Sequence, residues 1–183
     1  MPIYIIEHLD KLGKWNFIEY KHISKIVGKK NLWFTNCKSA KLKKYGKVIG
    51  RSVRELDLDK VCVLDPEANE ILKSGDRKKF KYFVFGGILG DYPPRRRTKK
   101  EISKFFSELR NIGKKQMTTD NAVYTVKRIL DEEKFSQLEF LDKLEIKMRK
   151  HESLSLPFRY NVVNGKPLIS KELLELIRRK KGF

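Results

Sequence analysis

The chain of 183 residues carries 42 Lys and Arg against 23 Asp and Glu, which gives a net charge of +19 at pH 7. Its composition, 40% hydrophobic, supports one globular domain with a buried core, and it contains no apolar run of about 18 residues, the length needed to cross a membrane. These features exclude a membrane-spanning protein, and because the N-terminus also lacks the apolar block of a signal peptide we expect a cytoplasmic protein.

The excess of positive charge predicts an anionic partner, and RNA or a ribonucleoprotein is the first candidate. Alternatively, the basic residues merely solvate the surface. Abundant lysine also suits a protein from a hot environment. Cys37 and Cys62 have no partner at C-x-x-C spacing, so neither a disulfide framework nor a zinc site is expected.

Three short apolar runs in the first third of the chain have the length and composition of buried strands: residues 2–6, 31–35 and 61–64. Glu7 and His8 follow the first run and therefore lie at a strand terminus. A helix is expected between the first two runs, with Gly28 placed to end it. Residues 38–51 are dense in lysine and predict an irregular basic helix or loop, either a solvated face or an RNA contact.

The most informative stretch is a strand followed by a glycine-rich loop. Residues 80–85 are aromatic and apolar, and residues 85–94 read FGGILGDYPP. A helix is predicted soon afterwards, because Thr98 and Glu101 have the spacing of a capping box. The glycines are thus placed in a strand-to-helix loop, where missing side chains would let backbone groups approach a ligand at the end of a strand.

Helical spacing of four apolar residues predicts an amphipathic helix packed on the sheet: Ile102, Phe105, Phe106 and Leu109. A loop at residues 111–120 then opens a further helix, for which Thr118, Thr119 and Asp120 are competent N-cap residues. The N-terminus of that helix would add positive dipole to a binding site. Extended pieces within residues 138–148, a turn at Asn164-Gly165 and a last helix from near Ser170 complete the pattern.

Common catalytic motifs are absent. The glycine stretch matches neither a P-loop nor the G-x-G-x-x-G dinucleotide fingerprint. His8, His22 and His151 lack metal-ligand spacing, so no metal site is expected, and there is no nucleophile elbow. From the residues alone, the chain is a basic α/β protein whose glycine loop binds something small.

Three stretches carry a resemblance to a known family: Ile5-Ile6-Glu7-His8, the stretch FGGILGDYPPRRRT at residues 85–98, and QMTTDNAV at residues 116–123. They resemble the SPOUT-class methyltransferases and, more narrowly, the group of the fungal SPOUT protein-arginine methyltransferase and its archaeal relatives. The clusters at residues 150–153 and 157–160 also resemble that group. The resemblance extends from residue 3 to about residue 178.

The resemblance implies an α/β sheet flanked by helices with a C-terminal deep trefoil knot, and S-adenosylmethionine as methyl donor. It implies one SPOUT-like domain over residues 1–183, with the knotted part at about 60–135 and an appendage at about 136–183. In such folds three adjacent loops hold the donor. The donor-binding residues expected here are Leu64, Phe85, Gly86, Gly87, Leu89, Gly90, Gly113, Gln116, Met117, Thr118 and Thr119.

Methyl transfer to arginine calls for a carboxylate that orients the guanidinium and one that accepts its proton. Glu7 and Asp91, both at expected strand ends, are the catalytic candidates, with an ordinary cap or surface ion pair as the alternative for each. For the substrate, His8, Arg95, Arg97 and His151 are the binding candidates. The arginines could hold RNA phosphate or the donor carboxylate, or be merely solvated.

Two enzyme functions fit this pattern. One is methylation of an arginine in a small-subunit ribosomal protein, as in the fungal relative, and the other is methylation of ribosomal or transfer RNA. A non-catalytic RNA-binding module is a third reading, against which the intact glycine motif argues. The expected partners are a ribosomal protein or ribosomal RNA, and the chain is expected as a monomer or a homodimer.

Overall fold

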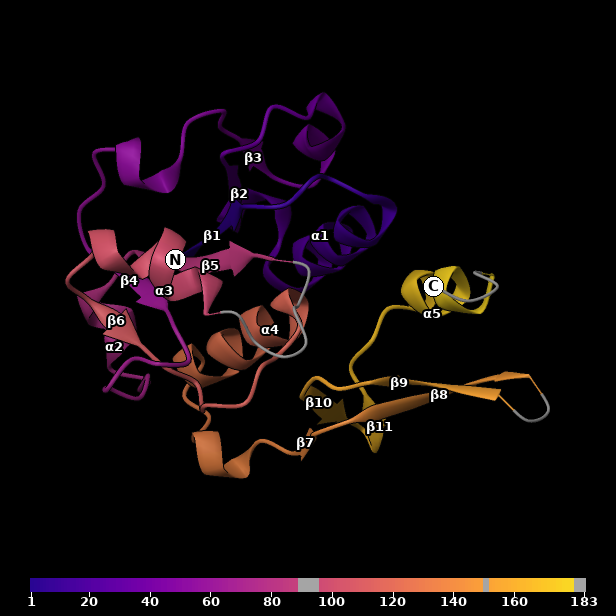
Figure 1. The fold of residues 1–183 in the computed structure, drawn as a ribbon. Coiled ribbons are helices and arrows are strands. Elements are labelled where there is room, and N and C mark those ends of the chain that lie inside the picture. Colours follow the sequence, from indigo (N-terminus) through magenta and orange to yellow (C-terminus); the bar gives the residue numbers. More distant parts are fainter. Residues whose placement is uncertain (89–95, 150–151, 180–183) are drawn as a thin grey trace.

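The computed structural model describes residues 1–88, 96–149 and 152–179, and its centre is a six-stranded sheet (Figure 1). The strand order is β3-β2-β1-β5-β4-β6, and the neighbouring strands in it pair in parallel. The strands are β1 (Ile3–His8), β2 (Leu32–Thr35), β3 (Lys47–Val48), β4 (Val61–Leu64), β5 (Tyr82–Gly87) and β6 (Leu109–Arg110). The expected α/β class is confirmed, whereas the trefoil knot stays a prediction.

The central strands are buried on both faces, which explains why they read as continuous apolar runs. In β1, Tyr4 and Ile6 point into one core cluster and Ile5 into the other. In β5, Phe83 and Val84 divide in the same way. The alternation of side chains along a strand thus places one core on each face of the sheet.

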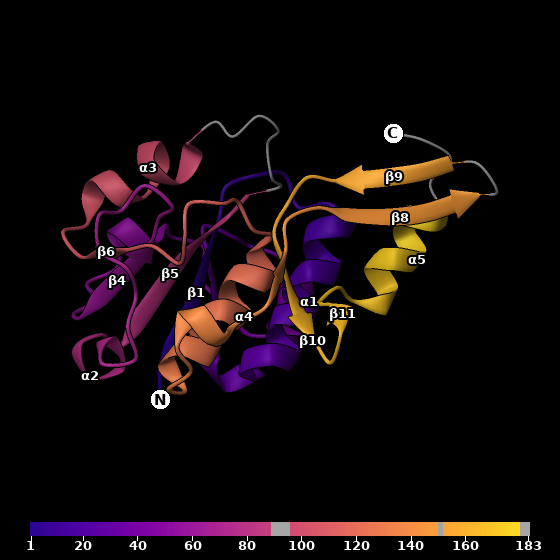
Figure 2. The ribbon, with the colours of Figure 1, turned by 90° about the horizontal axis from the view of Figure 1, so that it is seen from below.

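Two long helices cover the first face. These are α1 (Lys14–Val27), which ends at Gly28 as predicted, and α4 (Thr119–Leu130), and they pack against each other (Figure 2). The second face carries short elements instead. They are η3 (Val53–Glu55), α3 (Arg97–Glu101) and η4 (Ser103–Phe105), while α2 (Asp76–Lys79) precedes β5 and η1 (Lys29–Asn31) precedes β2.

The amphipathic helix predicted over residues 102–109 is not formed. Helix α3 ends at Glu101, and Leu109 lies in β6, where it pairs with Val63 of β4. Ile102 is fully buried, and Phe106 and Leu109 pack against the same core cluster. The four apolar residues therefore lie in an irregular segment that leads into the edge strand β6. This segment is not helical because Leu109 pairs with β4 instead.

The position of the glycines also differs from the expectation. Gly86 and Gly87 are the last residues of β5, opposite Glu7 and His8 of β1 in the register. They belong to the sheet, so the strand-to-helix loop begins only after them.

The C-terminal part forms hairpins and a helix that extend to one side of the sheet (Figure 1). Asn164 and Gly165 have positive φ and make the predicted turn between two of its strands. A third core cluster forms here and packs against Trp15 and Ile18 of α1. The elements are η5 (Phe135–Gln137), β7 (Phe140–Leu141), β8 (Leu144–Arg149), β9 (Glu152–Leu156), β10 (Tyr160–Val163), β11 (Lys166–Pro167) and α5 (Lys171–Arg179).

Among the described residues, no helix combines the length and apolar character needed to span a membrane. The same residues contain no group of three or more His, Cys, Asp or Glu side chains placed to hold a metal ion. Cys37 and Cys62 are buried and free.

Candidate functional site

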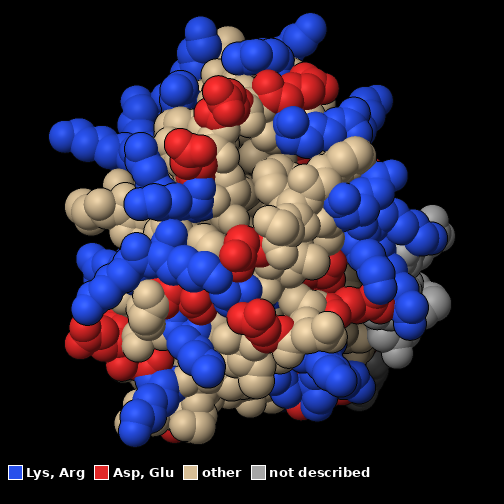
Figure 3. All heavy atoms as spheres, turned by 90° about the vertical axis from the view of Figure 1, so that its left-hand side faces the viewer, with Lys and Arg blue, Asp and Glu red and all other residues tan. Residues whose placement is uncertain are grey.

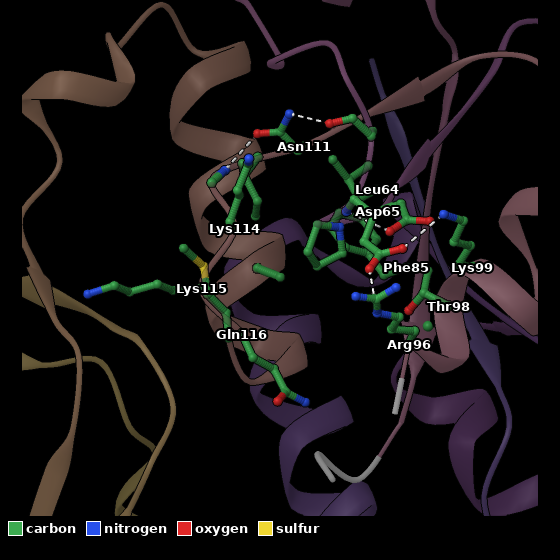
Figure 4. A pocket seen from close by; sticks show the side chains of 18 of the residues that line it. Leu64, Asp65, Phe85, Arg96, Thr98, Lys99, Asn111, Lys114, Lys115 and Gln116 are labelled. Atoms are coloured by element: carbon green, nitrogen blue, oxygen red, sulfur yellow. Dashed lines mark hydrogen bonds and ion pairs between the residues drawn. The ribbon is translucent and has the colours of Figure 1, made fainter. Parts of the chain in front are cut away.

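A cavity of about 990 Å³ lies at the carboxyl ends of β4, β5 and β6 (Figure 4). Three chain segments line it: the loop after β4, the end of β5 with α3, and the loop between β6 and α4. Its volume is at the upper end of the range usual for small-molecule sites, which leaves room for more than one ligand group. The predicted site residues that line it are Leu64, Phe85, Gly86, Arg97, Gly113, Gln116, Met117 and Thr119.

The loop after β4 is fixed by Asp65, which is 3% exposed. Its carboxylate accepts hydrogen bonds from the hydroxyl of Ser103 at 2.5 Å and from the backbone N–H of Glu67 at 2.9 Å. Asp65 directly follows the buried strand β4. One of its carboxylate oxygens accepts from Glu67 and starts a turn, and the other accepts from Ser103 and fixes η4. Both oxygens are thus occupied, and Asp65 serves to shape the cavity wall.

Asn111 joins the first loop to the third. Its amide nitrogen donates to the carbonyl oxygens of Ala68 at 2.8 Å and Glu70 at 3.0 Å. Its amide oxygen accepts from the N–H of Gly113 at 3.0 Å, where the chain turns with φ of 93°. One buried side chain therefore sets the distance between two walls of the cavity, as Figure 4 shows.

Charged side chains meet at the other wall. The guanidinium of Arg96 lies 2.7 Å from Oε1 of Glu67, and the ammonium of Lys99 lies 3.1 Å from its Oε2. Figure 4 shows Arg96 and Lys99 reaching from the segment at α3 toward the loop after β4. Arg96 adopts the left-handed backbone conformation with φ of 53°, which is uncommon for a residue with a side chain. Asp65 and Glu67 are the carboxylates among the described residues that line the cavity.

Arg97 also lines the cavity, but its guanidinium is bound by groups that do not line the cavity. Its guanidinium pairs with Asp10 at 2.6 Å and with Glu101 at 2.9 Å, and it donates to the carbonyl of Leu9. These contacts tie the start of α3 to the end of β1.

The loop between β6 and α4 ends beside two buried acidic residues, Glu19 and Asp120. Glu19 of α1 accepts a hydrogen bond from the N–H of Thr119 at 2.9 Å, and Asp120 pairs with His22 at 2.7 Å. Burial, and then the nearby charge of Asp120, raise the pKa of Glu19 well above its ordinary value of 4.5. Glu19 thus fixes the backbone of a cavity residue while itself favouring the neutral form.

Of the three N-cap candidates, Thr118 holds that position in α4, and it does not line the cavity. Its hydroxyl donates to Asp120 at 2.7 Å. It also accepts from the side-chain amide of Asn121 at 2.8 Å, so the hydroxyl joins side chains at the helix start and caps no backbone N–H.

Gly87 has a different role from the one expected. It does not line the cavity, and a Cβ built there would clash with the hydroxyl of Tyr20 and lie 2.8 Å from Cγ2 of Ile6 and 3.0 Å from the carbonyl oxygen of Glu7. Glycine at this position is required because β5 packs closely against β1 and α1. At Gly86, by contrast, a Cβ would lie 3.0 Å from Ile88 and 3.1 Å from the hydroxyl of Thr98, both of which line the cavity.

Glu7 is likewise turned away from the cavity. It is 2% exposed, and its carboxylate accepts from Thr35 at 2.5 Å, Ser52 at 2.6 Å and the N–H of Val53 at 3.0 Å. These donors come from the ends of β2 and η3. These contacts favour a structural role for Glu7, and the catalytic role expected from the sequence stays a prediction.

His8 is buried beside Glu7, and its Nδ1 lies 2.8 Å from the hydroxyl of Tyr20. Burial lowers the pKa of His8 from its ordinary value, so the neutral ring is favoured. It packs against Tyr20 of α1 and does not line the cavity, and its contact with substrate stays a prediction. The remaining candidates lie outside the described residues: Leu89, Gly90, Asp91, Arg95 and His151.

Sequence reasoning gave no site role to Glu67, Lys99 and Asn111, whereas it placed Asp65 in a donor-binding loop and Arg96 in a run of arginines that could contact a ligand. Asp65 and Asn111 each follow directly on a strand end, and that position is a usable signal for a site residue in a parallel sheet. The pairing of Glu67 with Arg96 and Lys99 joins residues about thirty positions apart, so no local pattern could have shown it.

The cavity combines apolar side chains, among them Leu64, Phe85, Ile112 and Met117, with loop backbone and charged groups. Such a mixture suits a ligand with a flat apolar part and a polar, charged part.

Comparison with known proteins gives one family. Residues 3–182 match the family described as SFM1-like, "Protein arginine N-methyltransferase SFM1-like". The chain is 38% identical over 201 residues to the protein arginine N-methyltransferase SFM1 of Saccharomyces cerevisiae, covering 96% of this chain and 94% of that protein.

Solved structures agree with this match. The yeast arginine methyltransferase SFM1 complexed with SAH superposes with a TM-score of 0.88 at 37% identity, covering 96% of this chain and 94% of that one. The same enzyme complexed with SAM gives a TM-score of 0.88 at 36% identity, with 97% and 90% covered. The dual specific Trm10 from Thermococcus kodakaraensis, at 17% identity and a TM-score of 0.60 over 75% of this chain and 96% of that one, shares the fold.

Proposed function

The chain belongs to the SFM1-like protein arginine N-methyltransferases, and on this premise we propose that its cavity binds the methyl donor and that the methyl group goes to an arginine of a small-subunit ribosomal protein. As a member, it is an S-adenosylmethionine-dependent methyltransferase. The observation that carries the proposal is the cavity itself, because it is lined by the three loops expected to hold the donor.

The residues of the cavity fit S-adenosylmethionine. Leu64, Phe85, Ile112 and Met117 offer apolar surface for an adenine ring, and the loop backbone offers N–H and C=O groups for the polar parts. Gly86 supports the fit, since a side chain there would occupy space between Ile88 and Thr98. The bound donor supplies a methyl group on a sulfonium, which is already strongly electrophilic, so the protein mainly has to hold both reactants in line.

The acceptor guanidinium needs a carboxylate, and we assign Glu67 to this task among the described residues. Asp65 is already used by Ser103 and the N–H of Glu67, whereas the partners of Glu67 are the long, flexible side chains of Arg96 and Lys99. Arg96 already places a guanidinium against this carboxylate. An acceptor arginine could therefore replace Arg96 there with the same charge-assisted contact.

Of the two catalytic candidates, Asp91 is the one that we propose as the proton acceptor. An arginine nitrogen must lose a proton once it carries the methyl group, so a carboxylate within reach of that nitrogen completes the reaction. Arg95 and His151 stay proposed substrate contacts.

Isothermal titration with S-adenosylmethionine tests the donor site, and incubation with labelled donor and either ribosomal proteins or RNA tests the acceptor. We expect donor binding and label in one small-subunit protein, at arginine. Label in RNA alone would replace this assignment by RNA methylation, which the charge of +19 also suits. A monomer or homodimer in the cytoplasm remains our expectation for its state and location.

A further inference from the structure

One segment of the chain holds most of the unbalanced positive charge. Residues 20–54, which we call the basic edge, contain eleven Lys and Arg and no Asp or Glu. This run accounts for more than half of the net charge of +19 in less than a fifth of the chain. Its cationic residues are Lys21, Lys25, Lys29, Lys30, Lys38, Lys41, Lys43, Lys44, Lys47, Arg51 and Arg54.

The basic edge forms one border of the sheet. It runs from the second half of α1 through β2 and η2 (Ala40–Lys44) to β3, the outermost strand of the sheet on that side, and on to η3. All eleven cationic residues except Lys21 are exposed. The charge therefore faces solvent along a continuous border.

The cations of the basic edge are largely without acidic partners. Among the described residues, the ion pairs formed by the eleven are those of Lys21 with Glu172 and Arg54 with Glu55. Elsewhere the charges are interleaved: Arg110 meets three carboxylates, and Asp142 holds both Lys115 and Arg159. Figure 3, which shows the side of β4, β6, α2 and α3, has acidic groups set among the basic ones. Cations without an ion pair also occur elsewhere, but the basic edge differs in containing no acidic residue of its own over 35 positions.

Aromatic rings lie beneath some of these cations. The ammonium of Lys47 is 4.1 Å from the ring centre of Trp33, and that of Lys44 is 4.9 Å from Tyr45 and 5.7 Å from Phe17. The three rings are half-buried. Such contacts hold a cation over a flat surface without cancelling its charge.

One part of the basic edge lies at the same end of the sheet as the cavity. Lys38 packs on Gly50, next to Arg51 at the carboxyl end of β2. Further along, the guanidinium of Arg54 lies 5.0 Å from the ring centre of Phe105, whose other neighbour is Lys104 at 4.9 Å. Phe105 lies with Lys60, Val61 and Phe80 at the amino ends of β4 and β5, so this contact leads away from the cavity. The part of the basic edge at Lys38 and Arg51 is the one that lies at the carboxyl ends of the strands, the end of the parallel sheet at which the cavity is found.

We infer that the basic edge binds the phosphate backbone of RNA and, resting here on the proposed function, that this RNA is the ribosomal RNA beside the acceptor protein. A row of exposed lysines with no intervening acid matches a polymer that carries one charge per nucleotide. A membrane surface fits less well, because the large exposed apolar residues among those described, Met1, Ile71, Phe105 and Leu141, all lie outside the basic edge. The RNA is here a docking partner and not the methyl acceptor.

The test compares two variants of the full chain with equal net charge. The edge variant replaces Lys38, Lys41, Lys43 and Arg51 by Ala. The control variant replaces Lys73, Lys78, Lys134 and Lys166 by Ala; all of these are exposed and lie outside the basic edge. Circular dichroism and urea unfolding establish that both variants fold.

Binding of a fluorescently labelled RNA hairpin is then measured against salt concentration. We expect the edge variant to lose at least about tenfold in affinity and to have a shallower slope of log K against log salt by about 2 to 4, since each lost phosphate contact contributes roughly 0.7 to 0.9. The control should stay within about twofold of the parent. An equal loss in both variants would mean that bulk charge alone acts and would overturn the inference. Binding of polyglutamate or anionic phospholipid vesicles as tight as RNA, with the same dependence on the edge residues, would also overturn it.

Methyl transfer separates this inference from the proposed function. The edge variant should methylate an isolated ribosomal-protein peptide at the parental rate but intact small ribosomal subunits at least several-fold more slowly. Absence of peptide methylation in every variant, with RNA binding still confined to the basic edge, would remove the proposed acceptor and leave the docking surface standing. Equal rates of all variants on intact subunits would remove its assignment to ribosomal RNA.

Discussion

Nε of Arg96 lies 2.7 Å from Oε1 of Glu67, and this ion pair joins the loop after β4 to the residue that precedes α3. The Arg96 side chain is 69% exposed and that of Glu67 is 28% exposed, so solvent screens the pair and its contribution to stability is small. Both residues line the cavity, so a guanidinium is already bound to a carboxylate at the site.

Replacing Glu67 by Gln tests its assignment to the acceptor. We expect KM for an arginine-containing acceptor peptide to rise about tenfold, equivalent to about 1.4 kcal/mol of lost charge-assisted binding. The affinity for S-adenosylmethionine, measured by titration calorimetry, should change by less than about twofold.

Asp131→Asn is the matched control, because it breaks ion pairs with Lys127 and Arg77 outside the cavity and should leave both constants unchanged. A loss of donor affinity in Glu67→Gln with KM of the acceptor unaltered would place Glu67 in the donor half of the cavity instead.

Gly87→Ala should destabilise the fold. The added methyl group meets the hydroxyl of Tyr20 and the backbone of Glu7, so β1, β5 and α1 must separate. We expect a loss of about 1 to 3 kcal/mol in the free energy of unfolding, measured with urea, as for other overpacked cores.

Gly75→Ala is the control for this prediction, because nothing lies within 4 Å of its added methyl group and its φ of −60° suits alanine. It should leave stability unchanged or slightly raised. If the Gly87→Ala protein were as stable as the parent but did not bind the donor, Gly87 would be assigned to donor binding and not to packing.

Glu7→Gln should act on stability and not on chemistry. The carboxylate accepts three hydrogen bonds in a buried site, and an amide cannot accept all three while its NH₂ group faces donors. We expect a loss of about 1.5 to 3 kcal/mol in urea unfolding. At a temperature where the variant is folded, kcat should be within about threefold of the parent, since Glu7 does not line the cavity. A large fall in kcat at unchanged stability would instead support a catalytic role for Glu7.

Glu19 predicts a pH dependence of stability. Its pKa is raised in the folded state by burial and by Asp120, so the folded protein binds more protons than the unfolded chain between pH 4.5 and that raised pKa. Stability contributed by the neutral form is therefore complete below pH 4.5 and falls as the pH rises through this window. His22 faces the same cluster through its contact with Asp120.

Glu19→Gln mimics the neutral form and can still accept from the N–H of Thr119. Relative to the parent, its free energy of unfolding should increase with pH above 4.5 and run parallel below it, in urea titrations at several pH values. Parallel curves over the whole range would mean that Glu19 is ionised in the fold.

Much of the fold was readable from local patterns. The apolar runs of β1, β2, β4 and β5, the stop at Gly28 and the N-cap at Thr118 are short-range features, and the structure contains each of them. The helix expected over residues 102–109 failed because its apolar spacing was also compatible with an edge strand. Only the neighbouring strand β4, more than forty residues away, decides between the two.

The sequence by itself determined the fold class, the family and the three loops that form the cavity, because each rests on residues close together in the chain. Tertiary structure alone decided what individual residues do. A side chain at Gly87 would meet Tyr20. The carboxylate of Glu7 accepts from Ser52 and Val53, and that of Glu67 lies against the guanidinium of Arg96, which directly precedes α3. The physical reason is that the role of a polar or glycine residue is set by its neighbours, and these come from distant parts of the chain.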